Sequence, residues 1–388
     1  MYMSWPEFWW KHITGPSMVV KDVVQNLINN TMVALKVPED LPWRHYMRGV
    51  VEERFKRQTG LNQVLIEPID AIDDCPMGVA PGRFLIERFA NKEEVRHGYR
   101  DNSNKSVQEY IIENEILKNR IVWVKGLAKR QALEWQAFCK EFDTKAVESG
   151  LIVLEIQGNV TTVESIRLKV VDFAKSVSRD DVRLFNSFFL DESKGLSSEW
   201  RNYIATVSAL LCDKDAEVSM YLLDNTDFAN ESPIEGIGRL CEDSVFTRRG
   251  EDIHSGHVLS YYRTNNLDIL NKRVWIAQVQ ILFPIIELER VEIIRRLESD
   301  VKNALKVYPV KQYGSDVTDP YNVELGTLCH MIKSQNGDGM YQLYIRDQAL
   351  REDIEFLKEC RNTIAHMNCC NPAEIGRIID LYDKICKD

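Results

Sequence analysis

The chain has 388 residues, of which 44% are hydrophobic and 28% are charged, and its formal net charge is −10 at pH 7. These proportions are ordinary for a globular protein, and the length allows two or three domains. The negative balance excludes a protein whose whole surface attracts nucleic acid, so any contact with RNA or DNA must use a local basic site.

The first 190 residues alternate apolar strands with helices. Strands are expected at 32–37, 63–67, 120–124 and 151–155, and helices at 19–27, 44–57 and 128–148. Apolar strands that alternate with helices are typical of a mainly parallel sheet covered by helices. We therefore predict an α/β domain over residues 1–195.

The loop after the first strand decides whether this domain binds a nucleotide. Residues 38–44 read Pro-Glu-Asp-Leu-Pro-Trp-Arg, and Lys125 and Gly126 follow the strand at 120–124. The order of elements resembles the layout of a P-loop or AAA-like NTPase, which needs Gly-x(4)-Gly-Lys-Ser/Thr in the first loop and an acid after the later strand. The two acids of residues 38–44 repel a phosphate, and the two prolines lack the backbone N–H groups that would bind one. We therefore expect a degenerate domain without ATP hydrolysis. Arg44 is either a phosphate contact or a solvent-exposed arginine at a helix start.

Residues 196–310 are expected to form a helical domain. Its helices are predicted at 197–211, 234–243 and 267–305, and Pro284 should kink or split the last of them. Arg273 and Gln278 are polar residues in or beside an apolar part of this helix. They are either ligand contacts or paired contacts between domains, as most buried polar groups are paired.

A C-terminal helical bundle is expected at residues 320–388. The preceding segment, 308–321, carries two prolines, a glycine and two aspartates, which is typical of a linker. Helices are predicted at 322–333 and 343–366. A closing helix starts at residues 371–374, Asn-Pro-Ala-Glu, which supply a cap, a first-turn proline and a reciprocal acid.

The end of the helix at 343–366 holds the candidate site. Residues 361–366 read Arg-Asn-Thr-Ile-Ala-His. The guanidinium of Arg361 can hold a phosphate, and the imidazole of His366 can move a proton at neutral pH. Arg361 falls on the apolar stripe of the helix, where a charge needs a partner. Asn362 and His366 are four residues apart and therefore share a face.

Two other interpretations of this pattern stay open. Arg248 and Arg249 precede His254 at a similar spacing, but that stretch is polar and rich in glycine, so it is expected to be a loop. The pair Arg361 and His366 could also be structural. A helix-end cation is favoured by the helix dipole, and the arginine could be tied to an acid of a neighbouring helix.

Residues 357–367, Leu-Lys-Glu-Cys-Arg-Asn-Thr-Ile-Ala-His-Met, resemble the signature helix of HEPN domains. These small all-α bundles carry Arg-x(4–6)-His with a polar residue after the arginine. Many are metal-independent ribonucleases of toxin, CRISPR and antiviral systems, and others only bind partners. The resemblance implies that Arg361 binds the scissile phosphate, that His366 is a general acid or base, and that Asn362 orients the histidine or contacts RNA. It also implies a homodimer, because the family usually forms its site across two chains.

Nine cysteines occur, none of them in a CxxC pair. No segment has the length of a membrane span, and no secretory leader is recognised, so we expect reduced thiols in a cytoplasmic protein without a membrane segment. A zinc site can be drawn from one histidine and three cysteines, namely Cys329, His330, Cys369 and Cys370. Adjacent cysteines are poor ligand pairs, so neither a metal nor a cofactor is expected.

Two functions follow as hypotheses. The first is a HEPN-type, metal-independent endoribonuclease that acts on RNA in a prokaryotic defence or toxin-like system. The second is a non-catalytic adaptor in a multi-protein defence complex, with an inactive NTPase-like domain and a tail that dimerises.

Overall fold

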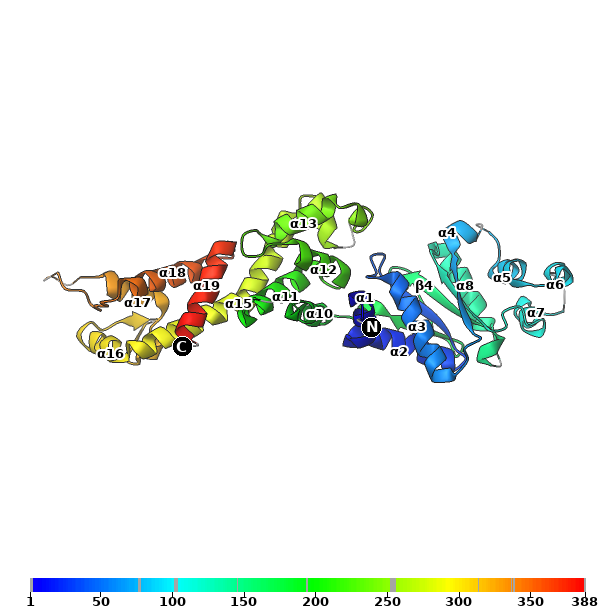
Figure 1. Ribbon diagram of the computed structural model, residues 1–388, viewed down its shortest axis with the longest axis horizontal. Coiled ribbons are helices and arrows are strands. Elements are labelled where there is room, and N and C mark those ends of the chain that lie inside the picture. Colours follow the sequence, from blue (N-terminus) through cyan, green and yellow to red (C-terminus); the bar gives the residue numbers. More distant parts are fainter. Residues whose placement is uncertain are drawn as a thin grey trace. The chain divides into compact units, whose positions relative to one another are not determined.

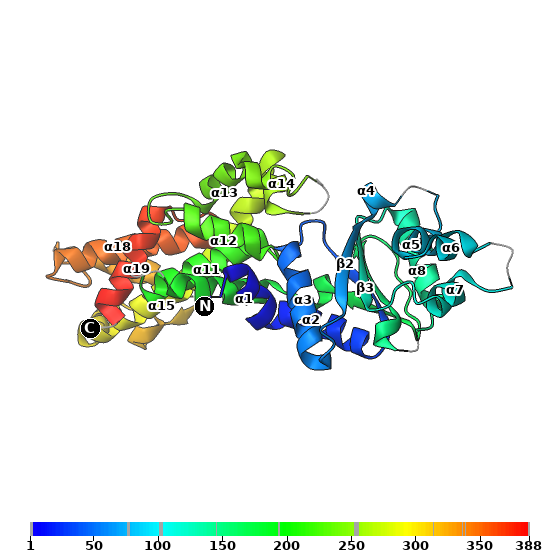
Figure 2. The same ribbon diagram turned by 45° about the vertical axis from the view of Figure 1, so that its right-hand side comes forward.

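The computed structural model describes residues 3–75, 78–100, 104–144, 146–192, 195–251, 256–312, 314–335, 337 and 339–386. The chain divides into two compact units, one of residues 1–185 with 214–217 and one of residues 186–213 with 218–388 (Figures 1 and 2). Within the described residues, no helix combines the length and the hydropathy needed to cross a membrane.

The first unit is built on a parallel sheet. Its described strands are β1 (Met32–Val37), β2 (Leu65–Asp70), β3 (Arg120–Lys125), β4 (Leu151–Gln157) and β5 (Leu168–Asp172). They lie in the order β2-β3-β4-β1-β5, and every neighbouring pair is parallel. The prediction of a mainly parallel sheet is confirmed. The predicted strands lack β5, whose sequence Leu-Lys-Val-Val-Asp is short and partly polar because it lies at an edge of the sheet.

Helices cover this sheet. The described helices of the unit are α1 (Trp5–His12), α2 (Thr14–Ile28), α3 (Arg44–Thr59), α4 (Ala71–Asp74), α5 (Pro81–Phe89), α6 (Glu93–Gly98), α7 (Val107–Glu113), α8 (Lys129–Glu141) and α9 (Phe173–Ser176), and α10 (Arg179–Asp191) spans the division between the units. α2 lies against β1 and β5, and α8 lies against β4. The aromatic N-terminus is core, because Trp9 and Trp10 of α1 are fully buried and Trp9 meets Phe185 edge to face at 5.6 Å.

The second unit is helical. Its described helices and strands are α11 (Ser198–Cys212), α12 (Ala216–Asn225), α13 (Pro233–Glu242), α14 (Val258–Arg263), α15 (Leu267–Arg296), α16 (Glu298–Val307), α17 (Leu325–Lys333), α18 (Gln348–Ala365) and α19 (Pro372–Cys386), with a short hairpin of β6 (Lys311–Gln312) and β7 (Ser315–Asp316). The first two residues of α12, Ala216 and Glu217, belong to the first unit. α15 contacts α11, α14, α18 and α19, so it is the central helix of the unit. The segments expected as separate domains at 196–310 and 320–388 share one hydrophobic core here.

Of the two predicted effects of Pro284, a kink or a split, the split is wrong. α15 continues through it from Leu267 to Arg296, and the break falls at Leu297 instead. Proline removes one backbone hydrogen bond, to the carbonyl of Gln280 four residues earlier. Both Pro284 and Gln280 are exposed, so water can satisfy that carbonyl, while buried neighbours such as Leu282 and Ile286 hold the helix in place.

Candidate functional site

The carboxyl ends of β1, β3 and β4 form the edge at which open parallel sheets bind ligands. Arg44, the first residue of α3, lies at this edge and folds back over the loop after β1. Its Nη2 donates to the carbonyls of Pro38 at 3.2 Å and Glu39 at 3.0 Å, and its Nη1 lies 3.5 Å from Oε2 of Glu155. Arg44 is partly exposed, and its hydrogen bonds and its counter-charge come from the domain itself. Its charge is neutralised inside the domain.

Glu155 supplies the negative charge that is paired with Arg44. It is 4% exposed on the otherwise apolar strand β4, and its Oε1 accepts a hydrogen bond from Nε1 of Trp123 on β3 at 2.6 Å. A buried carboxylate at this position repels the negative charge of a phosphate. The sequence carries a signal for it, because an acid in a strand of buried aliphatic residues needs a partner.

The amide at the start of α3 is also occupied. Trp43 has a left-handed backbone, with φ 44° and ψ 49°, and its N–H donates to Oε2 of Glu217 at 2.8 Å. In a nucleotide-binding loop such an amide points at a phosphate. Here an internal carboxylate accepts that hydrogen bond, so this donor is committed within the chain.

The ends of β2 and β3 carry a second ion pair. Nζ of Lys125 lies 2.7 Å from the carboxylate of Asp70, and this hydrogen bond lowers the pKa of Asp70. The side chain at the end of β3 is thus a cation, where an NTPase needs an acid for its metal ion. Across the described ranges, no group of three or more His, Cys, Asp and Glu side chains is arranged to hold a metal.

α18 carries the residues of the HEPN-like pattern. Its buried positions are Ile354, Leu357, Cys360 and Ile364. The prediction that Arg361 lies on this apolar stripe is confirmed only in part, because its side chain is half-buried. Cys360, 2% exposed, occupies the stripe, and Arg361 lies at its half-buried margin.

The guanidinium of Arg361 packs on an aromatic ring of the central helix. Its carbon lies 6.0 Å from the centre of the Phe283 ring, and Nη1 lies 3.5 Å from Oδ1 of Asn362. Among the described residues, no carboxylate lies within ion-pair distance of it. The structural alternative, an arginine tied to an acid of a neighbouring helix, does not describe this contact.

His366 is exposed and ends the helix. It is the residue after α18, and its N–H donates to the carbonyl of Asn362 at 3.0 Å. Met367 follows with a positive φ of 61° and turns the chain away. Asn362 and Arg361 lie within the last turn of α18, whereas His366 is its C-cap and has a non-helical backbone.

The other sequence candidates lie elsewhere. His254, the alternative partner of Arg248 and Arg249, lies outside the described residues. Arg273 donates to the carbonyl of Leu211 at 2.7 Å, so it caps the end of α11. Gln278 bonds the backbone of Cys370 through both amide atoms. These polar groups are paired structural contacts within the second unit.

The thiols of the zinc alternative do not converge on one point. Sγ of Cys329 donates to the carbonyl of Ile354, whereas Sγ of Cys369 donates to that of Asn271. Burial raises the pKa of Cys329 to about 11, so it stays a neutral thiol near pH 7. Zinc needs thiolates directed at one centre, which these contacts do not provide.

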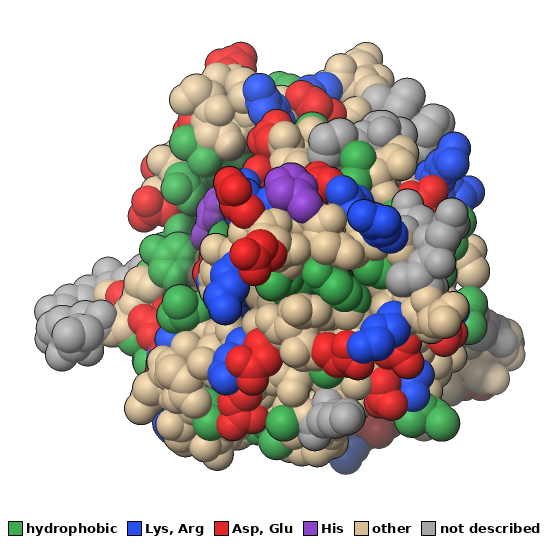
Figure 3. All heavy atoms as spheres, turned by 90° about the vertical axis from the view of Figure 1, so that its right-hand side faces the viewer, with side chains coloured by type: hydrophobic (Ala, Val, Ile, Leu, Met, Phe, Trp, Pro, Cys, Tyr) green, Lys and Arg blue, Asp and Glu red, His purple; other side chains and the backbone are tan. Residues whose placement is uncertain are grey.

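Charges on one face of the first unit are mixed. Figure 3 shows the side on which α5, α6 and α7 lie in Figure 1, and Lys and Arg side chains there are interspersed with Asp and Glu. Among the described side chains visible on this face, the basic groups do not form a continuous surface. Such a face gives no strong electrostatic attraction for nucleic acid.

Comparisons with known proteins find little. No family model matches the chain, and no curated protein matches it. Solved structures of Drosophila ORC align over most of the chain. ORC bound to poly(dA/dT) DNA and Cdc6 is 12% identical, with 95% of this chain and 69% of that chain covered and a TM-score of 0.23. ORC bound to DNA is 10% identical, with 96% and 72% covered and a TM-score of 0.28. These TM-scores are too low to establish a shared fold.

Proposed function

We propose that the helical C-terminal region acts on RNA as a metal-independent endoribonuclease of the HEPN type, in a prokaryotic defence or toxin-like system. One observation carries the proposal. The guanidinium of Arg361 is half-buried with no carboxylate of the described residues beside it, and the exposed imidazole of His366 follows it at the end of the same helix. A cation without an internal counter-charge is suited to a phosphate.

The reaction would be attack by the ribose 2′-hydroxyl on the adjacent phosphate. His366 would take or give the proton, and Asn362 would orient the imidazole or hold the RNA. Arg361 would stabilise the negative charge that builds up on the phosphate in the transition state. No step of this reaction requires a metal.

Arg361 is half-buried within α18 and His366 is the exposed residue that follows the helix, and we propose that two copies of the chain complete the site. In a twofold dimer, the arginine of one copy and the histidine of the other can line one cleft. This arrangement also fits the family resemblance.

The alternative proposal is a non-catalytic adaptor with an inactive NTPase-like domain. The order of strands, with β1 between β4 and β5, fits the AAA-like layout. The specific observation in its favour is that the places where a nucleotide phosphate would bind already hold Glu155 beside Arg44 and Glu217 on the Trp43 amide. Such a domain could recognise a protein partner without turnover.

Cleavage of RNA in EDTA separates the two proposals. Wild type, His366→Ala and a control, His330→Ala on the exposed part of α17, would be compared at equal concentration. General acid–base catalysis contributes about 10²–10⁴ in rate, so His366→Ala should lose at least about 100-fold while the control keeps its activity. Equally negligible cleavage by wild type and both variants supports the adaptor.

A further inference from the structure

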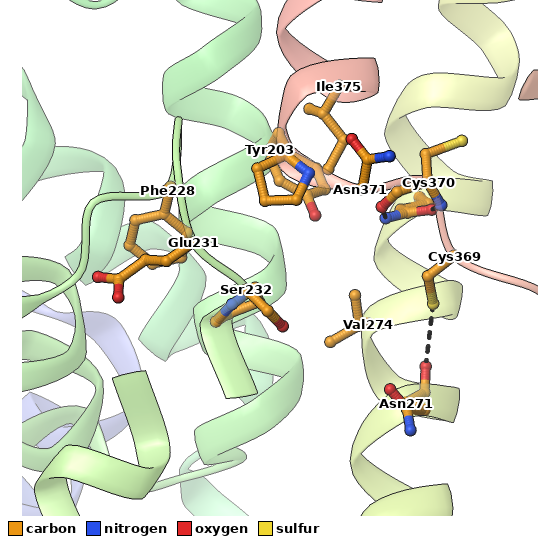
Figure 4. Close-up of a pocket in the computed structure, with 13 residues that line it drawn as sticks. Tyr203, Phe228, Glu231, Ser232, Asn271, Val274, Cys369, Cys370, Asn371 and Ile375 are labelled. Atoms are coloured by element: carbon orange, nitrogen blue, oxygen red, sulfur yellow. Dashed lines mark hydrogen bonds between the residues drawn. The ribbon is translucent and has the colours of Figure 1, made fainter. Parts of the chain in front are cut away.

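A partly enclosed cavity of about 190 Å³ lies inside the second unit, apart from the HEPN-like motif. Its walls come from α11, α15, α19 and the loops before α13 and α19, and they include Tyr203, Phe228, Val274, Gln278, Cys369 and Ile375. In Figure 4, Phe228 and Ser232 lie on one side of the space and Val274 and Cys369 on the other. The walls are largely apolar, which is typical of sites for small organic molecules.

One polar group on this wall is unsatisfied. Tyr203 is 1% exposed, and its hydroxyl lies beside Gln278 but makes no hydrogen bond of good geometry with any of the described residues. The nearby amide of Gln278 is committed, because Nε2 donates to the Cys370 carbonyl at 2.9 Å and Oε1 accepts from the Cys370 N–H at 2.7 Å. Burial raises the pKa of Tyr203, so the hydroxyl stays protonated and can donate as well as accept. A buried hydroxyl without a partner is unfavourable, so a ligand atom that bonds it is stabilised.

The helix ends at the cavity do not make it an anion site. α13 and α19 begin here, but their first residues, Pro233 and Pro372, have no N–H. The amides that follow are capped, since Oγ of Ser232 accepts from Ile234 and Oδ1 of Asn371 accepts from Glu374. The two prolines and the two capping side chains thus leave few free backbone N–H groups to bind a negative ligand at these helix starts.

Charge at the cavity also disfavours an anion. Glu231 lines the cavity, and its carboxylate is 2.6 Å from Nη2 of Arg239, which neutralises it in place. Arg239 is not among the lining residues, so the charged group that lines the space is an acid. A ligand here should be neutral.

Size limits the ligand further. A cavity of about 150 Å³ binds benzene, and a water takes about 30 Å³, so this space holds one molecule somewhat larger than a single ring.

We propose that this cavity binds a neutral planar heteroaromatic molecule of one or two fused rings, for which a purine base is the model. The ring contacts Phe228, Val274 and Ile375, and a ring heteroatom exchanges a hydrogen bond with Tyr203. This site does not depend on the ribonuclease proposal, because none of its lining residues belongs to that mechanism.

Calorimetric titration of the full chain with adenine, hypoxanthine and uracil tests the site, with benzoate as an anionic ring of similar size. We expect at least one base to bind with a Kd below about 1 mM and benzoate not to bind. Tyr203→Phe removes only the hydroxyl and should weaken the base about five- to tenfold, the worth of one neutral hydrogen bond. Tyr344→Phe, at an exposed tyrosine, should leave the affinity unchanged.

A second variant tests the cavity through its volume instead of through the hydroxyl. Val274→Phe fills the space and should abolish binding. Thermal unfolding of each variant shows whether it is folded, and Tyr203→Phe should unfold at or above the wild-type temperature because it removes an unsatisfied group. The site is overturned if none of the three bases binds, which would leave a cavity for water only, if benzoate binds as well as the bases, or if Tyr203→Phe binds them as tightly as wild type.

Discussion

The guanidinium of Arg44 lies 3.5 Å from the carboxylate of Glu155, which is buried near the carboxyl end of β4. This ion pair joins the start of α3 to the centre of the sheet. It stands where a phosphate-binding cation would be needed, and it turns a candidate ligand contact into a structural one. In the first unit, charges of the chain itself therefore occupy the carboxyl edge of the parallel sheet.

Replacing Glu155 should destabilise the first unit. Glu155→Ala leaves the indole N–H of Trp123 without its acceptor and Arg44 without its counter-charge. We expect a loss of about 3 kcal/mol in the free energy of unfolding, measured by urea denaturation. The matched control is Glu134→Ala, which breaks the exposed pair with Arg130 and should cost less than about 0.5 kcal/mol. Similar losses for both variants would mean that the buried pair is not a stabilising contact.

The wild-type protein should not bind ATP. The amide of Trp43 already donates to Glu217, and Arg44 is already paired, so a triphosphate would have to displace two carboxylates. Calorimetry with MgATP at millimolar concentration should show no binding heat. Micromolar binding that Arg44→Ala removes would contradict this reading of the loop.

The sequence predicts helices and strands better than it predicts which side chains contact one another. β1 is apolar except for Lys36, and the structure has it at Met32–Val37, the predicted range. For Arg361 and Arg44, the local sequence pattern does not predict which side chains they contact. Their partners, Phe283 and Glu155, lie on elements distant in sequence, and the spacing within one helix says nothing about which distant side chain will face it. The sequence also could not predict the environment of the Tyr203 hydroxyl, because a tyrosine in an apolar helix is ordinary.

Pro284 can be replaced with a gain in stability. It is exposed within a helix that does not break there, and it removes one backbone hydrogen bond. Pro284→Ala restores the bond to Gln280 and improves the helix propensity, so we expect a gain of about 1–3 kcal/mol, seen as a higher Tm. A lower Tm would show that the ring of Pro284 makes a packing contact that outweighs the missing bond.

Glu289 should make the second unit less stable at high pH. It is fully buried in α15, its carboxyl has no hydrogen-bond partner among the described residues, and burial raises its pKa to about 9. Because the pKa is higher in the folded chain than in the unfolded chain, the unfolded state releases this proton first as the pH rises. Glu289 therefore does not lower the free energy of unfolding below about pH 4. Above that pH it lowers the free energy of unfolding progressively, until the pH reaches the pKa of Glu289 in the folded protein.

Glu289→Gln isolates this effect. The free energy of unfolding of the variant minus that of wild type should rise with pH between 5 and 9, by at most about 1.4 kcal/mol per pH unit. Glu352→Gln, on the exposed side of α18, should show no such slope. A flat difference for Glu289→Gln would mean that this carboxyl ionises in the folded protein as readily as in the unfolded one.

The proposed ribonuclease site makes a prediction about mixed dimers. The proposed site, which uses Arg361 of α18 and His366 at its C-cap, is completed by a second copy. Arg361→Ala and His366→Ala should each be inactive when pure. When the two are mixed and exchanged, a random half of the dimers holds one site with both wild-type residues, so about a quarter of the wild-type activity should return. No recovery, in a mixture shown by mass to contain heterodimers, would place both residues in the same copy of the site.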